Sequence, residues 1–406
     1  MRTLWFTGAI TVALVLSACA PAGTPQVVKE VVKETVVVQG TAQVVKETVV
    51  VQSTPQVKEV IKEVVVTPTS EPMDAPGSVQ LNASGATFPQ PLYEDWAFAF
   101  NQRDPSVVIN YAGGGSGQGI KDIKAGTIDF AGSDALLGDR DYQEEPDLQM
   151  LPTVAGAVVA IYNIKGVTST ITLDANTVVG IFSGKIANWN DPALAKLNPD
   201  AKFPDLPINV VHRSDGSGTT NIFTLYLSAV SDDWKQAPGA GTAVEWPADK
   251  LGRGQGGKGN PGVAAAVQNT NGAIGYVELA YAKSNSILYA KMVNASGKTV
   301  EASIPSTVAA IKDAQFSDKL TAIIVNSKDP EAWPIAGFTY LIVYKDYKDC
   351  KKAEKLASFV QWALSDQSAI SRAGKLLYAP LPKEVTPKVL DAVGQITCNG
   401  KPVTAK

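Results

Sequence analysis

Histidine and cysteine are scarce in this 406-residue chain, which has one histidine and three cysteines. A single histidine leaves too few ligands and proton carriers for most metal sites and acid–base schemes. The net charge of −3 provides no basic field that would attract nucleic acid. We therefore expect no metal, no cofactor and no nucleic-acid partner, and the composition favours binding over catalysis.

The N-terminus has no apolar run long enough to span a membrane. Met1 and Arg2 precede the mostly apolar stretch 4–16, and small residues precede Cys19 in Leu-Ser-Ala-Cys, which resembles a bacterial lipobox. This pattern predicts a lipoprotein signal peptide over residues 1–18 and a mature chain that begins at a lipidated Cys19. Acyl chains on Cys19 would anchor the protein to the membrane outside the cytoplasm, at the cell surface or in the periplasm. An ordinary cleaved secretion signal is the alternative.

Aromatic residues are missing from residues 20–78, which consist mainly of Val, Lys, Glu, Thr, Gln and Pro. The nine residues 31–39 recur unchanged at 44–52, and a looser third copy spans 58–66. Valine pairs suit one face of a helix, whereas Thr-Val-Val-Val suits an extended chain, so helix, strand pairing and disorder all stay open. We interpret residues 19–78 as the lipidated N-terminus and a repeat tether.

The remaining core of about 330 residues is long enough for two domains, and its alternation of strand and helix patterns indicates an α/β fold. Its most informative stretch is an apolar run at 208–211 that breaks into Arg-Ser-Asp-Gly-Ser-Gly-Thr at 213–219 and then continues with helical spacing. A helix start offers unpaired N–H donors and a positive dipole end, which suit an anion. The candidate ligands in this loop are Arg213, Asp215, Ser217, Gly218 and Thr219.

Two loops upstream have the same design. Asn-Ala-Ser-Gly-Ala-Thr-Phe-Pro at 82–89 places Thr87 at a helix start, and the glycine-rich run 113–119 places Ser116 at another. Between them and the Arg213 loop, residues 127–134 read as a buried strand that ends on the carboxylate of Asp134. Three loops of this kind indicate that they converge on one anion site. The presence of an acid, Asp134, in such a site requires an explanation.

These segments resemble the phosphate-binding subunit of the Pst-type ABC transporter, a type II periplasmic solute-binding protein, here in a lipoprotein form. The resemblance runs from about residue 79 to the C-terminal region. It is carried by Gly-Ala-Thr-Phe-Pro (85–89), Gly-Ser-Gly (115–117), Phe-Ala-Gly-Ser-Asp (130–134), Arg-Ser-Asp-Gly-Ser-Gly-Thr (213–219), Gly-Lys-Ile-Ala-Asn-Trp (184–189), Gly-Ala-Ile-Gly-Tyr-Val-Glu (272–278) and Ala-Trp-Pro-Ile (332–335).

The resemblance implies a receptor that binds phosphate with high affinity and delivers it to the permease of an ABC transporter, without a reaction of its own. The phosphate contacts it implies are Thr87, Phe88 through its backbone N–H, Ser116, Asp134, Arg213, Asp215, Ser217, Gly218 and Thr219. Asp134 would accept a hydrogen bond from a phosphate proton, which sulfate lacks, and so act as a specificity filter. Asp215 would mainly hold Arg213 in orientation.

The family also implies a two-lobed type II periplasmic-binding-protein fold, in which each lobe is a mixed sheet flanked by helices and the ligand lies in the cleft between them. Lobe I would comprise 79–154 plus 333–406, and lobe II 155–332. The candidate crossings are 154–164 and the region around 333–335. We expect a monomer whose lobes close over the anion and present a changed surface to the permease.

Other interpretations remain open. The ligand could be another tetrahedral oxyanion such as sulfate, arsenate or molybdate, and the chain could instead be a secreted phosphatase-like enzyme or a surface stalk with a vestigial site. His212, Asp215 and Ser217 contain the letters of a hydrolase triad, but one turn could hardly aim all three at one another.

Residues 252–259 have the Gly-x4-Gly-Lys spacing of a nucleotide-binding loop but end in Gly259 instead of Ser or Thr. We interpret them as a glycine-rich surface loop that leads into a helix at 263–267. Cys350 and Cys398 remain once lipidation takes Cys19, and they could pair in an oxidising exterior, where they would close the helical run through Leu356 and Phe359.

Overall fold

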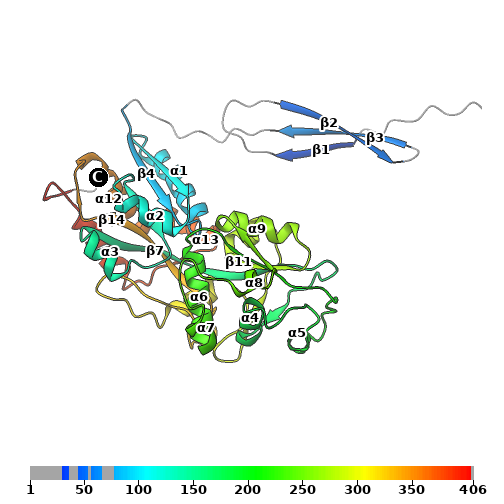
Figure 1. The fold of residues 1–406 in the computed structure, drawn as a ribbon. Helices are drawn as coiled ribbons and strands as arrows, with labels where there is room; N and C mark the ends of the chain where they lie inside the picture. The colour runs from blue at the N-terminus through cyan, green and yellow to red at the C-terminus, as the bar shows by residue number, and fades with distance from the viewer. Residues whose placement is uncertain (1–29, 36–43, 54–55, 66–76, 404–406) are drawn as a thin grey trace, which may run out of the picture. The chain divides into compact units, whose positions relative to one another are not determined.

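The computed structural model describes residues 30–35, 44–53, 56–65 and 77–403. The chain divides into two compact units, Met1–Glu71 and Pro72–Lys406 (Figure 1). The predicted signal peptide 1–18 and Cys19 lie outside the described residues, as do parts of the predicted tether. No helix of the described residues is long and apolar enough to cross a membrane.

The described residues of the first unit form three strands, which the valine-rich repeats provide. They are β1 (Glu30–Thr35), β2 (Val44–Ser53) and β3 (Gln56–Val65). The sheet order is β1-β3-β2, with β1 parallel and β2 antiparallel to β3. Of the three conformations left open for this segment, strand pairing is the one that these residues adopt, consistent with their β-branched composition.

The second unit is built on a nine-stranded mixed sheet, with the order β10-β9-β11-β7-β14-β6-β4-β5 and β16 paired to β7. Its strands are β4 (Val79–Gly85), β5 (Val107–Gly113), β6 (Phe130–Ser133), β7 (Leu148–Asn163), β9 (Asn209–Arg213), β10 (Gly254–Gly257), β11 (Ala273–Glu278), β14 (Ala336–Tyr344) and β16 (Ala379–Pro380).

The long strand β7 joins two parallel triplets that run in opposite directions. The first triplet consists of the parallel strands β4, β5 and β6, and the second of the parallel strands β9, β10 and β11. β7 pairs antiparallel with β11 on one side and with β14 on the other. β14 pairs antiparallel with β6. β6 does not pair with β7 directly, but β14 pairs with both, and in this register the end of β6 lies level with Pro152 of β7. The end of β11 lies opposite Val158 of β7. Six residues of strand span roughly 20 Å, so the carboxyl ends of the two triplets face each other across a short gap.

Helices cover both triplets, as the ribbon shows (Figure 1). Helices α1, α2 and α12 pack on strands of the first triplet, and α9 and α6 on strands of the second. The helices of this unit are α1 (Gln90–Arg103), α2 (Ser116–Lys124), α3 (Asp139–Glu144), α4 (Ala175–Phe182), α5 (Pro192–Leu197), α6 (Gly218–Val230), α7 (Asp232–Gln236), α8 (Pro247–Lys250), α9 (Gly259–Asn269), α10 (Leu279–Ser284), α11 (Ile304–Ile311), α12 (Cys350–Ser365), α13 (Gln367–Lys375) and α14 (Thr386–Gly394).

Two small sheets complete the unit, with the orders β13-β12-β8 and β15-β17-β18. Their strands are β8 (Thr172–Leu173), β12 (Lys291–Val293), β13 (Thr299–Val300), β15 (Asp346–Tyr347), β17 (Thr397–Cys398) and β18 (Lys401–Pro402). Cys350, the first residue of α12, forms a disulfide with Cys398 of β17, and the two Cα atoms lie 5.2 Å apart. This bridge ties the start of α12 to the C-terminal strands.

The α/β class and the mixed sheet flanked by helices agree with the prediction from the sequence. The two halves of the main sheet share β7, which covers most of the predicted crossing 154–164, and the second predicted crossing precedes β14 directly. The assignment of 79–154 plus 333–406 to one lobe and of 155–332 to another stays a prediction.

Candidate anion-binding site

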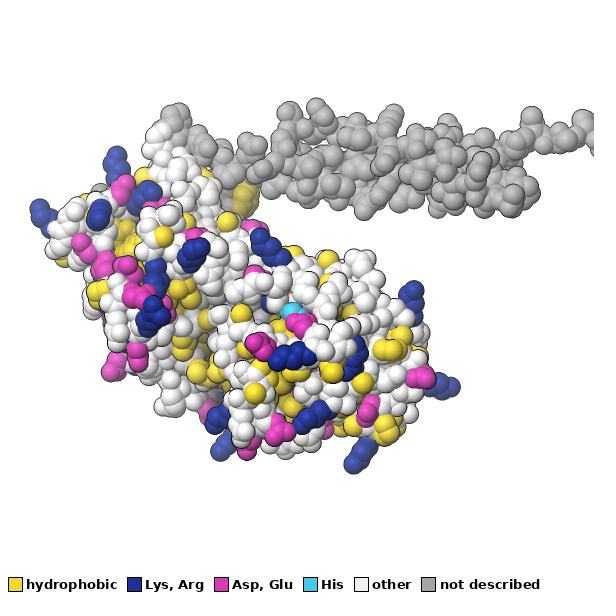
Figure 2. Space-filling model, viewed as in Figure 1, with side chains coloured by type: hydrophobic (Ala, Val, Ile, Leu, Met, Phe, Trp, Pro, Cys, Tyr) yellow, Lys and Arg dark blue, Asp and Glu magenta, His cyan; other side chains and the backbone are white. Residues whose placement is uncertain are grey.

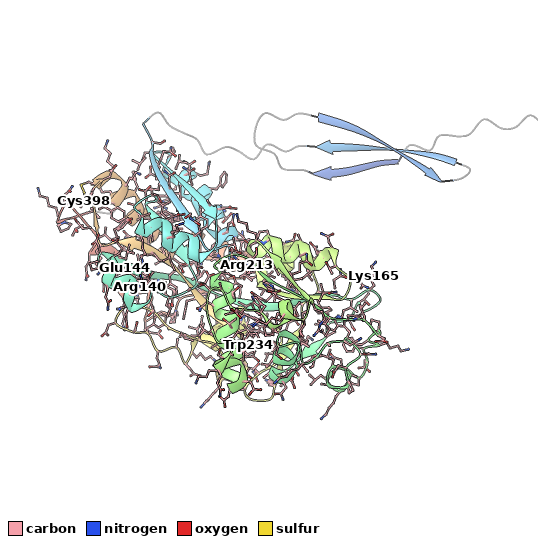
Figure 3. The ribbon with its side chains drawn as sticks, viewed as in Figure 1. Arg140, Glu144, Lys165, Arg213, Trp234 and Cys398 are labelled. Carbon is pink, nitrogen blue, oxygen red and sulfur yellow. A yellow bond between two sulfur atoms is a disulfide. The ribbon has the colours of Figure 1, made fainter. Side chains whose placement is uncertain are left out.

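The predicted site residues lie where strands of the two triplets end. Thr87 follows β4, Ser116 begins α2 after β5, and Asp134 follows β6 directly. Arg213 is the last residue of β9. Because the carboxyl ends of both triplets face the same gap, side chains far apart in sequence meet there, and the stick view places Arg213 between the two halves of the sheet (Figure 3).

The hydroxyl of Ser116 joins the two triplets. Its Oγ accepts hydrogen bonds from the backbone N–H of Asp134 at 3.2 Å and from that of Gly218 at 3.1 Å. A serine oxygen has two acceptor lone pairs and one proton to donate. Both lone pairs are used, and no acceptor in the described part of the chain takes the proton. Ser116, which is fully buried, therefore keeps its proton available for donation to a ligand.

The hydroxyl oxygens of Thr87 and Thr219 also accept two hydrogen bonds each. Thr87 Oγ1 accepts from the backbone N–H and the side-chain Nδ2 of Asn260, at 3.0 and 2.9 Å. Thr219 Oγ1 accepts from Asn260 Nδ2 at 3.1 Å and from Arg213 Nη1 at 3.4 Å. Each hydroxyl thus keeps only its proton to offer, and within the described residues no acceptor takes it. The three hydroxyls form a set of buried donors.

The guanidinium of Arg213 is held in place by a carboxylate. Its Nε and Nη2 donate to the two oxygens of Asp215 at 2.8 and 2.5 Å, and its side chain is 1% exposed. Asp215 Oδ1 also accepts from the backbone N–H of Gly259 at 2.9 Å. Burial opposes the charge on Asp215, but the hydrogen bonds and the charge of Arg213 outweigh it and lower the pKa of Asp215. This bidentate pair fixes the orientation of the arginine.

Asp134 has the opposite environment. Neither carboxylate oxygen has a hydrogen-bond partner among the described residues, although the side chain is buried. Burial raises the pKa of Asp134 to about 7, although the side chain of Thr339 and the positive charge of Arg213 act to lower it. In its ionised form this carboxylate can accept a hydrogen bond from a ligand that carries a proton, and it repels an anion that carries none.

Gly218 allows the close packing around Asp134. A Cβ atom at this position would lie 2.5 Å from both Asp134 Oδ2 and Ser116 Oγ. The first turn of α6 therefore approaches the acid and the serine more closely than any other residue type would permit.

Two predicted ligands have further contacts in the structure. Ser217 is the N-cap of α6, and its Oγ accepts from the N–H of Thr220 at 3.0 Å. The side chain of Phe88 is fully buried, and its carbonyl accepts from the hydroxyl of Tyr378 at 2.7 Å. Neither contact engages the Ser217 hydroxyl proton or the Phe88 N–H.

His212 faces away from Ser217. Its Nε2 lies 2.8 Å from Asp249 Oδ1, its Nδ1 lies 3.0 Å from the carbonyl of Arg213, and its ring stacks on Trp246. Both ring nitrogens are engaged on the other side of the strand from the site, as the alternation along β9 predicts. His212, Asp215 and Ser217 therefore do not form a hydrolase triad.

The sequence analysis missed Asn260, which follows the glycine-rich run 252–259. This run lies partly at the surface, as predicted, but it is not a loop throughout: Gly254–Gly257 form the strand β10, and Gly257, Gly259 and the following Asn260 are buried. Four consecutive residues without a branched side chain give no strand pattern, so nothing local revealed it. An asparagine immediately after such a turn, at a helix start, was the available signal.

A buried acid and two tyrosines behind the site were also missed. Glu278, at the end of β11, is fully buried, and burial raises its pKa well above the usual range. Its Oε2 lies 3.2 Å from the Tyr378 hydroxyl, and the Tyr281 hydroxyl donates to the carbonyl of Thr87 at 2.6 Å. These contacts join the backbone around Thr87 and Phe88 to the second triplet.

The described residues contain no group of three or more His, Cys, Asp or Glu side chains that could hold a metal ion. On the face shown in Figure 2, basic and acidic side chains are interspersed, without a broad patch of one sign. At the site itself, Arg213 carries a positive charge, and Asp215 pairs with it.

Comparison with known proteins gives consistent matches. A family model described as a PBP superfamily domain matches residues 70–367. The phosphate-binding protein PstS of Xylella fastidiosa (strain 9a5c) is 40% identical over 315 residues, which cover 77% of this chain and 84% of that protein. The phosphate-binding protein PstS of Pasteurella multocida (strain Pm70) is 39% identical over 312 residues, covering 76% and 88%. The solved structure of a human phosphate binding apolipoprotein aligns with a TM-score of 0.64 at 22% identity, covers 80% of this chain and 99% of that one, and shows likeness of fold.

Proposed function

We infer that this chain, which belongs to the PBP superfamily and within it to the PstS phosphate-binding proteins, binds inorganic phosphate outside the cytoplasm and delivers it to the permease of an ABC transporter. It is a binding protein, not an enzyme. The matches to PstS proteins at 40% and 39% identity support this inference, and the geometry of the strand ends supplies the chemistry.

One observation supports phosphate in particular: three buried hydroxyl donors and Arg213 accompany one carboxylate that lacks a partner among the described residues. Phosphate at neutral pH offers oxygens to the donors and a proton to Asp134. A fully deprotonated dianion such as sulfate leaves the carboxylate unpaired and meets charge repulsion, which costs on the order of 1–3 kcal/mol or more. The site therefore fits a protonated tetrahedral anion.

We assign the phosphate contacts to the residues predicted from the sequence. Hydroxyl donors are Thr87, Ser116 and Thr219, Arg213 supplies the charge, and Asp134 the acceptor. Backbone or hydroxyl groups of Phe88, Ser217 and Gly218 complete the set, and Asp215 acts through Arg213.

The facing strand ends support two lobes, 79–154 plus 333–406 and 155–332, that close over the anion. Closure brings together the contacts of Ser116 with Gly218 and of Thr87 with Asn260. At the N-terminus, lipidation of Cys19 would anchor a monomeric receptor to the membrane, with residues 19–78 as the tether.

The test is calorimetric titration with phosphate and with sulfate at neutral pH, after bound anion has been removed by unfolding and refolding. We expect phosphate affinity in the micromolar range or tighter, and sulfate at least about a hundredfold weaker, which corresponds to about 2.7 kcal/mol. Sulfate binding as tight as phosphate would overturn the substrate assignment and favour another oxyanion. No binding of either anion would overturn the function, and hydrolysis of a chromogenic phosphate ester would favour an enzyme.

A further inference from the structure

We propose that Asn260 is a positioning residue of the phosphate site, which fixes the direction of the hydroxyl protons of Thr87 and Thr219. This inference rests on the proposed function, because it concerns how the same site is oriented. It assigns a role in binding to the residue that follows the glycine-rich run 252–259, a run for which the sequence predicted only a surface loop.

Backbone geometry brings Asn260 into the site. β10 pairs with β9 next to Arg213, and the chain then turns at Gly259, whose φ of +67° is a left-handed conformation that favours glycine. A Cβ atom on Gly259 would lie 3.1 Å from Thr87 Cγ2, so the turn also needs a small residue there. Asn260, the second residue of α9, is consequently fully buried between Thr87 and Thr219.

Every hydrogen-bonding group of the Asn260 side chain is used. Nδ2 donates to Thr87 Oγ1 at 2.9 Å and to Thr219 Oγ1 at 3.1 Å, and Oδ1 accepts from the backbone N–H of Glu278 at 2.9 Å. The bond from Glu278 fixes which end of the amide faces the threonines, because an N–H can pair only with the amide oxygen. Asn260 therefore presents donors to both hydroxyls.

The consequence concerns where the hydroxyl protons point. A threonine oxygen that accepts from an N–H cannot donate its own proton back to that nitrogen. Asn260 thus prevents both hydroxyls from donating to it and leaves their protons for an anion. Prearranged donors of this kind do not have to reorient when the anion arrives. Thr87 belongs to the first predicted lobe and Thr219 to the second, so one amide orients donors on both.

The test is a mutant cycle, measured by phosphate calorimetry on the anion-free full chain. Asn260→Ala is expected to weaken phosphate binding by about ten- to hundredfold, because two hydroxyl donors to a charged ligand lose their orientation. In a Thr219→Val background one of those hydroxyls is gone, so the effect of Asn260→Ala should shrink by about threefold or more. Equal effects in both backgrounds would mean that Asn260 does not act through Thr219, and would overturn the inference.

Two further variants separate orientation from general damage. Asn260→Asp keeps the shape but turns a donor into an acceptor, so it should also weaken binding at least about tenfold while the protein stays folded. Asn198→Asp is the matched control: Asn198 is also buried, and among the described residues its side chain bonds only to the backbone of Thr172 and Leu194. It should lower stability and leave phosphate affinity within about twofold of the unaltered protein.

The outcomes distinguish the two inferences. If the unaltered protein binds phosphate and both Asn260 variants bind equally well, the positioning role is overturned and the proposed function stands. If the unaltered protein binds no phosphate, both are overturned. Weakened binding in Asn260→Ala and Asn260→Asp, with a smaller effect beside Thr219→Val, supports the positioning role.

Discussion

Asp134 is kept in an environment that costs the empty protein stability. Its oxygens are buried without partners among the described residues, and burial raises its pKa to about 7. The folded state therefore holds the proton more tightly than the unfolded chain, in which an aspartate has a pKa of about 3.9. The stability that this group contributes is present in full below that value and is lost as the pH rises toward about 7.

Asp134→Asn should remove this loss. We expect the phosphate-free variant to be more stable than the unaltered protein at pH 8, by at most about 4 kcal/mol for a shift of roughly three pKa units. The two proteins should differ least near pH 4. Denaturant unfolding at pH 4, 6 and 8 measures this difference, and a difference that does not grow with pH would contradict the raised pKa.

The same substitution should reduce selectivity. An amide in place of the acid can donate to sulfate, so the preference for phosphate over sulfate is expected to fall by at least about tenfold. Competition titration of the two anions measures it. Unchanged selectivity would show that Asp134 is not the filter.

Gly218 should be intolerant of alanine. The added Cβ would lie 2.5 Å from Asp134 Oδ2 and from Ser116 Oγ, so one of these side chains must move, at a cost of about 1–3 kcal/mol. Phosphate binding is expected to weaken by about tenfold or more, as calorimetry would show. The control is Gly374→Ala in α13, where a Cβ meets nothing within 4 Å. It should leave binding unchanged and raise stability by up to about 1 kcal/mol.

At the scale of secondary structure, the sequence predicted where those candidate site residues lie whose position depends on local pattern. Ser116 and Gly218 begin helices, Arg213 ends a strand, and Asp134 follows one, because glycine, serine and threonine next to apolar runs mark these boundaries. α12 likewise contains the predicted helical run through Leu356 and Phe359, whose side chains are buried.

Features that depend on long-range pairing could not be predicted. β10 is recognisable only because β9 supplies its hydrogen-bond partners, and Asn260 acquires its role from Thr87, 173 residues away in the sequence. Glu278 likewise reads as the acidic end of a strand, and only the surrounding packing reveals that it is buried beside Tyr378. Local pattern carries no information about these contacts.

The disulfide between α12 and β17 should affect stability and not binding. Cys350 and Cys398 are 48 residues apart in sequence, and opening a loop of this length costs about 2–4 kcal/mol. Figure 3 shows Cys398 at the end of the unit remote from Arg213. We expect the double variant Cys350→Ser/Cys398→Ser to melt at a lower temperature and to bind phosphate within about twofold of the unaltered protein. A large loss of affinity would mean that this region communicates with the site.

At the scale of the whole molecule, the arrangement of the sheet explains why one anion can hold two predicted lobes together. The parallel triplets run in opposite directions, so donors from one face donors from the other across the middle of β7. Protein contacts already cross this gap: Ser116 with Gly218, Thr87 with Asn260, and Tyr378 with Glu278. An anion that accepts from both sides adds to contacts that favour the same closed arrangement.

Substitution of Tyr378 tests whether these protein contacts contribute to lobe closure independently of the anion. Its hydroxyl bonds to the carbonyl of Phe88 and lies 3.2 Å from Glu278 Oε2, in the other predicted lobe. Burial raises the pKa of Glu278 well above its usual range, and a hydrogen bond of this kind is worth about 0.5–1.5 kcal/mol. Tyr378→Phe should therefore weaken phosphate binding by about two- to tenfold, mainly through faster dissociation, which stopped-flow displacement measures.

Tyr344→Phe is the matched control, because the Tyr344 hydroxyl donates to the carbonyl of Ile123 and both residues belong to the first predicted lobe. This variant loses a comparable hydrogen bond without separating the lobes, so its dissociation rate should stay close to that of the unaltered protein. If both variants released phosphate equally fast, the Tyr378 contact would contribute to the overall stability of the protein and not specifically to lobe closure. Faster release from Tyr378→Phe alone would place part of the free energy of closure in the protein itself, where it sets the phosphate affinity without touching the anion.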